Sequence, residues 1–149
     1  MAINPKGVGH VVLKVRDLDR SARFYREVIG LNEVARYRDR MVFFSATGAN
    51  HHDLALLEVG AQASAPAPDA VGLYHVALKI GDRIDDLRAA KAHLEAHGIT
   101  PLRLADHRVS KSIYLTDPDG NGLELFVDTD PAIWRENPEI GRASCRERV

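Results

Sequence analysis

The stretch GVGHVVLKVRDLD at residues 7–19 is repeated later in the chain as GLYHVALKIGDRID at residues 72–85. Superimposing the two stretches at an offset of 65 positions gives identities that include Gly7 with Gly72, His10 with His75, Leu13 with Leu78, Lys14 with Lys79 and Asp17 with Asp82. Shared apolar positions alone would mean little, but a shared glycine, histidine, lysine and aspartate indicate duplication. The sequence therefore predicts two copies of one module.

Each copy is predicted to form a strand, a helix and then three short strands. In the first copy VVLKV is the strand, Asp17 caps the helix, and Gly30 ends it. The apolar residues of this helix follow helical spacing: Leu18, Ala22, Tyr25 and Ile29. The later strands of the first copy are ARY, MVFFSA and DLALLEV.

The second copy repeats this order of elements. Asp82 or Asp85 can cap its helix, and His97 followed by Gly98 suits the helix end. One stripe of the helix, with a lysine stem counted as apolar, consists of Ile84, Leu87, Lys91 and Leu94. The later strands of the second copy are PLRLA, SIYLT and GLELFVD.

The predicted fold class is α+β, with two paired βαβββ modules that form a cup-shaped mixed β-sheet around the site. Module one covers about residues 7–60 and module two about residues 72–130 of a single domain within residues 1–138. GAQASAPAPDAVG at residues 60–72 is a linker rich in alanine and proline. EIGRASCRERV at residues 139–149 resembles the in-frame translation of a sequencing adapter and is interpreted as a non-native tail.

The composition is that of one globular domain. Of 149 residues, 45% are hydrophobic and 28% are charged, which provides enough apolar side chains for a core. Twenty lysines and arginines against 21 acidic residues give a formal net charge of -1, so we expect no nucleic-acid partner. No apolar run approaches the roughly 18 residues of a membrane span, and no secretory signal is recognised, so we expect a cytoplasmic protein without a membrane partner. Cys145 is the single cysteine of the sequence, which excludes an internal disulfide framework.

Two histidines occupy the same place in the two modules. His10 and His75 each lie within an apolar first strand, where a single histidine is more often a hydrogen-bonded core residue. As a symmetry-related pair they would project into the cup from opposite sides, which favours a shared metal ion. Glu124 lies inside the apolar strand GLELFVD and is either solvent-exposed or buried beside a partner, because an isolated buried carboxylate is costly. Two imidazoles and one carboxylate form the facial triad that leaves open positions on Fe(II).

Three other histidines are predicted to lie outside the metal site. His93 and His97 are separated by one helical turn, but they lie on the polar side of their helix, which indicates solvent exposure. His51 begins a strand beside a turn and is interpreted as a surface residue or a residue just behind the site.

His52 is predicted to face the cup opposite Glu124. It follows the turn glycine Gly48 by four residues, as Glu124 follows Gly120. In that position it serves either as a fourth metal ligand or as a titratable imidazole just beyond the metal, able to donate or accept a proton.

Together these residues resemble the vicinal oxygen chelate superfamily, built from paired βαβββ modules, and within it the extradiol ring-cleaving catechol dioxygenases. The resemblance covers about residues 7–130, and the superfamily match rests on the repeated histidine strands and on DPDGNGLEL at residues 117–125. The extradiol signature is similar to HRVSKSIYLTDPDGNGLE, with matches at His107, Ile113, Tyr114, Asp117, Pro118, Gly120 and Glu124. Ala105 departs from the signature, although one small residue replaces another.

The resemblance implies a ligand set and an ion. His10, His75 and Glu124 would bind Fe(II), and Mn(II) is the alternative ion for the same three ligands. The implied reaction is extradiol cleavage of a small aromatic diol by O2, with no residue assigned to an organic cofactor. We expect a homo-oligomer, in which a chain either closes its own cup or exchanges modules with a second subunit.

The resemblance also implies three residues that act on the substrate. His52, in HHDLAL at residues 51–56, matches the family's acid/base histidine and would stabilise the oxygen species and move protons. His107 would hydrogen-bond a substrate oxygen, and Tyr114 would bind and orient the diol. Taken singly, His107 would be a turn histidine and Tyr114 a core tyrosine; their joint spacing with Glu124 favours the functional interpretation.

Two other kinds of function stay open. A metal-dependent lyase, isomerase or thiol transferase, resembling glyoxalases, epimerases or fosfomycin-resistance enzymes, would share the cup. The glyoxalase and epimerase types need a second carboxylate in the place given to His52, and Glu58 lies six residues further along, about 20 Å at strand rise. The thiol-transferase type shares the triad but explains neither His107 nor Tyr114. A binding module similar to bleomycin-sequestering proteins would have no use for the triad.

Overall fold

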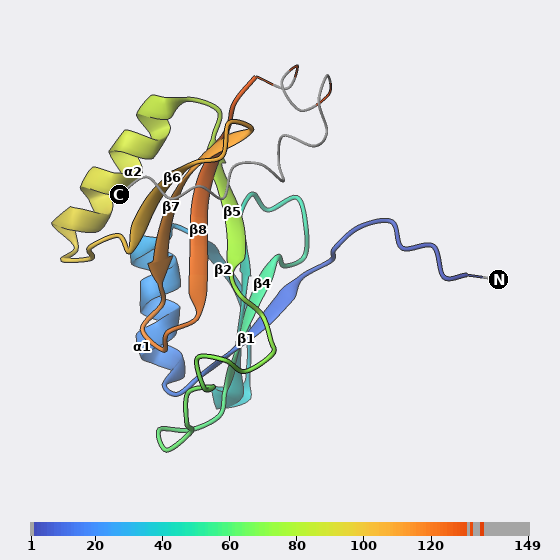
Figure 1. Cartoon of the computed structure of the whole chain (residues 1–149). Helices are drawn as coiled ribbons and strands as arrows, with labels where there is room; N and C mark the ends of the chain where they lie inside the picture. The colour runs from blue at the N-terminus through green and yellow to red at the C-terminus, as the bar shows by residue number, and fades with distance from the viewer. Residues whose placement is uncertain (1, 131, 133–134, 136–149) are drawn as a thin grey trace. The chain divides into compact units, whose positions relative to one another are not determined.

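The computed structural model describes residues 2–130, 132 and 135, and it contains two four-stranded sheets (Figure 1). The chain divides into two compact units, Met1–Ala70 and Val71–Val149, and the division falls within the linker predicted at residues 60–72. Each unit has a strand, a helix and three further strands, which confirms the duplicated βαβββ module and the α+β class. The tail predicted at residues 139–149 lies outside the described residues.

The first unit follows the predicted order of elements. These are β1 (Val11–Val15), α1 (Leu18–Arg23), a π-helical turn (Phe24–Val28), β2 (Asn32–Tyr37), a 3-10 turn (Arg38–Arg40), β3 (Met41–Ser45) and β4 (Leu54–Glu58). The sheet order is β1-β4-β3-β2, in which β1 and β4 are parallel and the other pairs antiparallel. Asp17 caps α1 as predicted, because its carboxylate accepts a hydrogen bond from the Arg20 backbone N–H at 2.9 Å.

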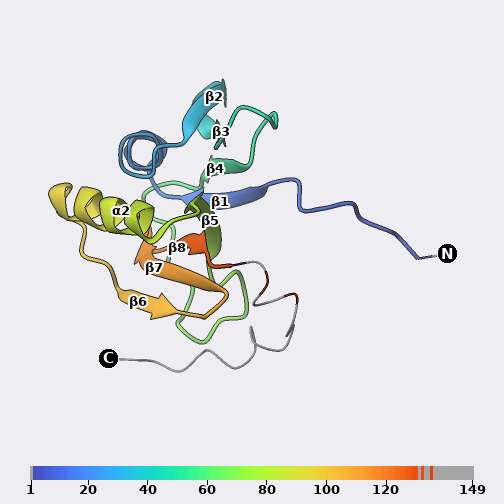
Figure 2. The same ribbon diagram turned by 90° about the horizontal axis from the view of Figure 1, so that it is seen from above.

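The second unit repeats this topology. Its elements are β5 (Val76–Gly81), α2 (Ile84–Ala96), β6 (Arg103–Asp106), β7 (Ser110–Thr116) and β8 (Gly122–Asp128). The sheet order is β5-β8-β7-β6, with β5 and β8 parallel, and α2 lies along one face of this sheet (Figure 2).

The cap of α2 differs from the prediction. Neither Asp82 nor Asp85 caps the helix; the carboxylate of Asp86 instead accepts hydrogen bonds from the backbone N–H groups of Asp82 and Arg83, at 3.2 and 3.0 Å. The side chain of an acidic residue at the third helical position can accept hydrogen bonds from the backbone N–H groups that precede the helix, and Asp86 therefore caps α2. The predicted end is confirmed, with Gly98 in a left-handed conformation (φ 72°) after His97.

Alternation along the strands separates an apolar face, covered by the helix, from the opposite face. In the first unit the buried residues on the helix side include Leu13, Val15, Val42, Phe44, Leu54 and Leu56. In the second unit they include Ile113, Leu115, Leu123, Leu125 and Val127, with Leu87 and Leu94 from α2. No helix in the described residues is both long enough and apolar enough to cross a membrane.

The paired histidines lie just outside their strands and not within them. β1 begins at Val11 and β5 at Val76, so His10 and His75 each precede the first ladder residue. The parallel ladders begin after these histidines: the first pairs are Val11 with Leu54 and Val76 with Leu123. Each imidazole therefore stands at the end of a parallel strand pair.

Candidate functional site

One row of residues crosses all four strands of the second sheet. Ala77 pairs with Glu124, Glu124 with Tyr114, and Tyr114 with Arg103. Directly paired residues point to the same side of a sheet. Ile113, which alternates with Tyr114, is buried on the side where α2 packs. The row therefore lies on the face opposite α2.

Glu124 is buried, with 8% of its surface exposed, so the solvent-exposed alternative is wrong. Its Oε1 accepts a hydrogen bond from the Ser112 hydroxyl at 2.5 Å, and its Oε2 lies 3.0 Å from Nε2 of His75. Burial of a carboxylate is costly unless its oxygens have partners. Both oxygens have one here, and the carboxylate is oriented toward His75.

The donor atoms of His75 and Glu124 fit two adjacent positions around one octahedral metal ion. With metal–ligand bonds of about 2.1 Å, adjacent octahedral donors lie about 3.0 Å apart. The separation between His75 Nε2 and Glu124 Oε2 is 3.0 Å. A neutral imidazole beside a carboxylate is the donor chemistry that Fe(II) and Mn(II) accept. The second unit therefore places two donors of the predicted triad at a separation that two adjacent ligands of one ion can have.

Aromatic packing orients the His75 imidazole. Its ring centroid lies 5.2 Å from that of Tyr74 and 5.6 Å from that of Tyr114. Within the described residues its buried Nδ1 has no hydrogen-bond partner, so these ring contacts and the Glu124 carboxylate at Nε2 position the imidazole. Gly122 lets β8 pass this residue closely, because a Cβ there would collide with the Tyr74 carbonyl and press on the His75 side chain.

We expect Ser112→Ala to weaken metal binding by about 10- to 100-fold, because it removes the donor that orients Glu124. Metal titration of the folded variant would measure this. Ser110→Ala is the matched control: the same strand loses the same atom, but Ser110 pairs with Asp128 and not with a predicted ligand. Equal metal affinity in the two variants would contradict the role of Ser112.

His107 and Tyr114 are in direct contact, as their joint spacing predicted. Nε2 of His107 lies 2.8 Å from the Tyr114 hydroxyl oxygen. His107 lies in the tight connection between β6 and β7, where Arg108 has a positive φ of 65° and the His107 N–H donates to the Ser110 carbonyl. The hairpin thus presents the imidazole to a tyrosine on the strand beside Glu124.

The Tyr114 hydroxyl keeps its proton at neutral pH. Burial raises the pKa of Tyr114 and the neighbouring Glu124 carboxylate raises it further, while Arg103 opposes the shift. The Arg103 guanidinium carbon lies 4.4 Å from the centroid of the Tyr114 ring. Tyr114 is therefore a hydrogen-bond donor on the face that carries Glu124.

The first unit brings three histidines together. The His52 ring centroid lies 4.2 Å from that of His10 and 4.4 Å from that of His51, whose Nδ1 is 2.5 Å from Nδ1 of His52. Phe43 packs edge-on against His52 at 5.1 Å. Desolvation lowers the pKa of His52, and the neighbouring His10 and His51 lower it further. His52 is therefore a neutral imidazole beside a predicted metal ligand.

His52 is not the strand counterpart of Glu124 that equal spacing from the turn glycines predicted, and its place opposite Glu124 in the cup stays a prediction. Val12 of the first unit pairs with Ala55, and the corresponding Ala77 of the second unit pairs with Glu124, so Ala55 is the counterpart of Glu124. The β3–β4 connection, residues 46–53, is longer than the β7–β8 connection, residues 117–121. Equal spacing from a turn glycine therefore did not give equal strand positions. His52 precedes β4 and reaches His10 from that connection.

Glu58 caps a helix. Its Oε2 accepts a hydrogen bond from the Leu18 backbone N–H at 3.0 Å, at the start of α1. The carboxylate considered for a glyoxalase-type ligand is thus engaged on the side of the sheet where α1 packs. Ala55, at the position equivalent to Glu124, carries no donor atom.

We expect Glu58→Ala to cost about 1 kcal/mol of unfolding free energy, because the Leu18 N–H at the start of α1 loses its acceptor while the Asp17 cap remains, and to leave metal content unchanged. Urea denaturation and metal analysis would measure the two effects. Glu27→Ala is the control, because that exposed glutamate pairs only at the surface with Arg26 and should change stability little. Metal loss from Glu58→Ala would instead support a second carboxylate ligand.

The predicted ligands are divided between the two units. His10 belongs to the first unit, while His75 and Glu124 belong to the second. In the described part of the chain, no three histidine, cysteine, aspartate or glutamate side chains form a ready metal cluster. His93 on α2 and His97 just after the helix are both exposed, which agrees with the surface interpretation.

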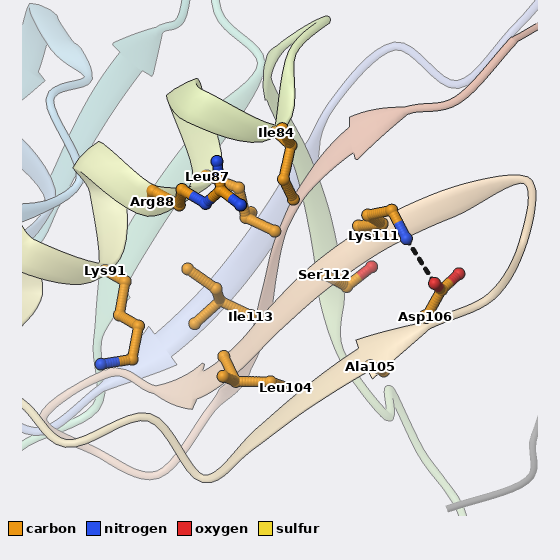
Figure 3. A pocket seen from close by; sticks show the side chains of 10 residues that line it. All are labelled: Ile84, Leu87, Arg88, Lys91, Leu104, Ala105, Asp106, Lys111, Ser112 and Ile113. Atoms are coloured by element: carbon orange, nitrogen blue, oxygen red, sulfur yellow. Dashed lines mark hydrogen bonds and ion pairs between the residues drawn. The ribbon is translucent and has the colours of Figure 1, made fainter. Parts of the chain in front are cut away.

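A cavity of about 340 Å³ lies between α2 and the β6–β7 hairpin (Figure 3). Its walls include Leu87 from the helix and Leu104 and Ile113 from the sheet, with an ion pair between Lys111 and Asp106 at one end. Leu104 pairs with Ile113, on the face opposite Tyr114. The apolar walls of the cavity therefore lie on the face opposite the candidate site, although Ser112, which hydrogen-bonds Glu124, also lines it.

Two residues of the site were not predicted from the sequence. Ser112 and Arg103 have no place in the extradiol signature as a ligand or a substrate contact. Strand alternation could have placed Ser112 on the same face as Tyr114, because the two residues are two positions apart. Arg103 lies on the neighbouring strand and pairs with Tyr114. Their partners depend on the register of β6, β7 and β8, which alternation does not determine.

Comparison with known proteins supports the resemblance. The profile described as Glyoxalase/Bleomycin resistance protein/Dioxygenase superfamily matches residues 7–125. A catechol-2,3-dioxygenase of Bacillus subtilis (strain 168) is 38% identical over 133 residues, which cover 89% of this chain and 45% of the relative. Biphenyl-2,3-diol 1,2-dioxygenase 3 of Rhodococcus globerulus is 33% identical over 132 residues, covering 86% of this chain and 66% of the relative. The chain thus spans less than two thirds of the length of either relative.

A solved structure shows that the same fold also occurs with a different activity. The crystal structure of lactoylglutathione lyase from Agrobacterium tumefaciens matches with a TM-score of 0.65 and 27% identity. The match covers 87% of this chain and 97% of that chain. Overall similarity therefore leaves the choice of reaction to the side chains of the site.

Proposed function

Because the chain belongs to the glyoxalase/bleomycin resistance protein/dioxygenase superfamily, we propose that it is an extradiol dioxygenase. The proposed reaction opens the ring of a catechol-type diol beside the two hydroxyl groups and adds both atoms of O2 at a non-haem Fe(II). The dioxygenase names of the two curated relatives support this choice. Fe(II) is proposed ahead of Mn(II), which the same donors accept.

The contact between His107 and Tyr114 beside Glu124 is the observation that carries the proposal. The Tyr114 hydroxyl lies 2.8 Å from His107 Nε2, on a residue paired directly with Glu124. A ligand triad alone suits several reactions of the superfamily. A protonated tyrosine and a histidine next to the carboxylate supply the two polar contacts needed to orient a bound diol.

The proposed ligands are His10, His75 and Glu124. When bound there, Fe(II) would supply adjacent coordination positions and a path for electrons between the diol and O2. His75 and Glu124 are already oriented by Tyr74, Tyr114 and Ser112.

Three other residues act on the substrate in this proposal. Tyr114, whose raised pKa keeps it protonated, donates a hydrogen bond to one diol oxygen. His107 holds the Tyr114 hydroxyl and binds a substrate oxygen. His52, a neutral imidazole beside His10, accepts and returns protons during ring opening. A homo-oligomer in the cytoplasm, without nucleic-acid or membrane partners, stays a prediction.

A lyase or isomerase activity is the second candidate, supported by the likeness to the Agrobacterium lyase. A glyoxalase-type site needs a second carboxylate in the first unit. Ala55 occupies the position equivalent to Glu124, and Glu58 caps α1, so that carboxylate is missing among the described residues of the first sheet. The thiol-transferase type needs only the triad and leaves His107 and Tyr114 without a role.

The deciding experiment is an oxygen-uptake assay on protein loaded with Fe(II) in the absence of air. Oxygenated catechol, methylcatechol and dihydroxybiphenyl are added separately, and we expect a yellow ring-opened product with matched O2 consumption for at least one of them. The same sample treated with a chelator is the control. A folded, iron-loaded sample that consumes no O2 with any of these diols, but converts the hemithioacetal of methylglyoxal and glutathione, would establish the lyase candidate instead.

A further inference from the structure

Arg103 stands at the outer end of the row that contains Glu124 and Tyr114. It lies on the edge strand β6, is half-buried, and pairs with Tyr114 across the ladder. Its guanidinium carbon is 4.4 Å from the centroid of the Tyr114 ring. Arg103 is therefore a cationic group on the face that carries Glu124, where Lys79 is already paired with Asp128.

Arg103 has no carboxylate partner among the described residues, unlike several other arginines of the chain. Those with acidic partners include Arg26, Arg36, Arg83 and Arg88. The two nearest acidic groups on the same face are engaged elsewhere: Glu124 with Ser112 and His75, and Asp128 with Lys79. The guanidinium lies over the Tyr114 ring and carries several N–H groups, so those that the Tyr114 contact does not use can bind a planar anion.

The surroundings of Arg103 leave room for such an anion. The next residue of β6 on the same face is Ala105, paired with Ser112, so the neighbouring side chains are small. Arg103 is two strands away from Glu124, which corresponds to roughly 10 Å between their backbones. A diol held at Glu124 and hydrogen-bonded by Tyr114 would extend its far edge across the intervening strand toward Arg103.

We propose that Arg103 binds an anionic substituent of the substrate, so that the preferred diols are catechols with a carboxylate on the ring edge away from the hydroxyl groups. This inference rests on the proposed dioxygenase function and narrows its substrate class. A planar carboxylate matches the two parallel N–H groups of a guanidinium. Arg103 determines specificity in this view, while the diol end of the substrate is recognised by the metal, Tyr114 and His107.

The test measures binding without turnover. Protein loaded with Fe(II) is titrated in the absence of O2 with 3,4-dihydroxybenzoate and with 4-methylcatechol, which replaces the carboxylate by a methyl group. We expect Arg103→Met to weaken binding of 3,4-dihydroxybenzoate by about 10- to 100-fold and that of 4-methylcatechol by less than about twofold. Arg103→Lys, which keeps the charge but loses the planar fork, should give an intermediate loss.

Arg88→Met is the matched control. It removes the same kind of side chain from the same unit, but Arg88 lies on α2 and pairs with Asp85, so neither diol should bind differently. Circular dichroism and thermal unfolding would show that each variant is folded. If Arg103→Met fails to fold, Arg103→Lys and Arg103→Gln carry the same comparison between the two diols.

Two outcomes would overturn the inference, and they differ from failure of the proposed function. If Arg103→Met weakened binding of both diols equally, Arg103 would act only by positioning Tyr114. If it changed neither, Arg103 would have no part in binding. Oxygen uptake with 4-methylcatechol reports separately on the dioxygenase activity, because that diol carries no anion for Arg103 to bind.

Discussion

Glu124→Ala is expected to remove bound iron and turnover together. The carboxylate is 8% exposed, and its two oxygens contact Ser112 and His75 at 2.5 and 3.0 Å. Loss of a residue that hydrogen-bonds to a metal ligand typically weakens metal affinity by about 10- to 100-fold, so loss of a direct ligand should weaken it by more than about 100-fold. Turnover of a catechol should then fall to the level of the metal-free protein. His10→Ala should have the same effect from the other unit.

Metal content and oxygen uptake, measured on the same samples, would check this prediction. Glu124→Gln is a useful second variant, because it keeps the shape and an oxygen that can accept from Ser112 while it removes the negative charge. His93→Ala is the control, since that histidine lies on the exposed side of α2 and should leave iron and turnover unchanged. Full activity in His10→Ala or Glu124→Ala would exclude the proposed ligand set.

His52→Phe is expected to keep the iron and to lose about 10²- to 10⁴-fold of turnover, the contribution typical of a general acid or base. Phenylalanine preserves a flat ring between His10 and Phe43, whose centroids lie 4.2 and 5.1 Å from that of His52. The packing that holds His10 is therefore retained, whereas the ring nitrogens that would carry a proton are removed.

The measurement for His52→Phe is turnover per bound iron, so that a change in loading is not mistaken for a change in chemistry. His51→Phe is the matched control, because it changes the adjacent, exposed histidine in the same way. We expect that variant to retain most of its turnover. Iron loss from His52→Phe alone would instead make His52 a fourth ligand and would contradict its role in proton transfer.

The extent to which the site was predictable differs between its two halves. In the second unit the spacing of His107, Tyr114 and Glu124 was enough to expect a cluster, and the structure places His107 and Tyr114 2.8 Å apart beside Glu124. These three residues belong to one hairpin and the following strand, so short turns limit their arrangement. In the first unit, counting from Gly48 identified the wrong residue as the equivalent of Glu124, because the β3–β4 connection is longer than the β7–β8 connection.

The order of elements in each module followed from the sequence alone. Strand alternation, helical spacing from Leu18 to Tyr25, the Asp17 cap and the glycines that end the helices are local signals, readable within one or two turns of chain. The repeated histidine stretch added the duplication. None of these features depends on which distant segment a strand meets.

Only the tertiary structure decided the features that depend on register. These features are the burial of Glu124, the contacts of its two carboxylate oxygens with Ser112 and His75, and the equivalence of Ala55 to Glu124 in the first sheet. The tertiary structure also aligned Arg103 with Tyr114. Periodicity tells which residues of a strand share a face, but pairing across strands depends on loop lengths and on hydrogen bonds between residues far apart in sequence. The site is built from those pairings.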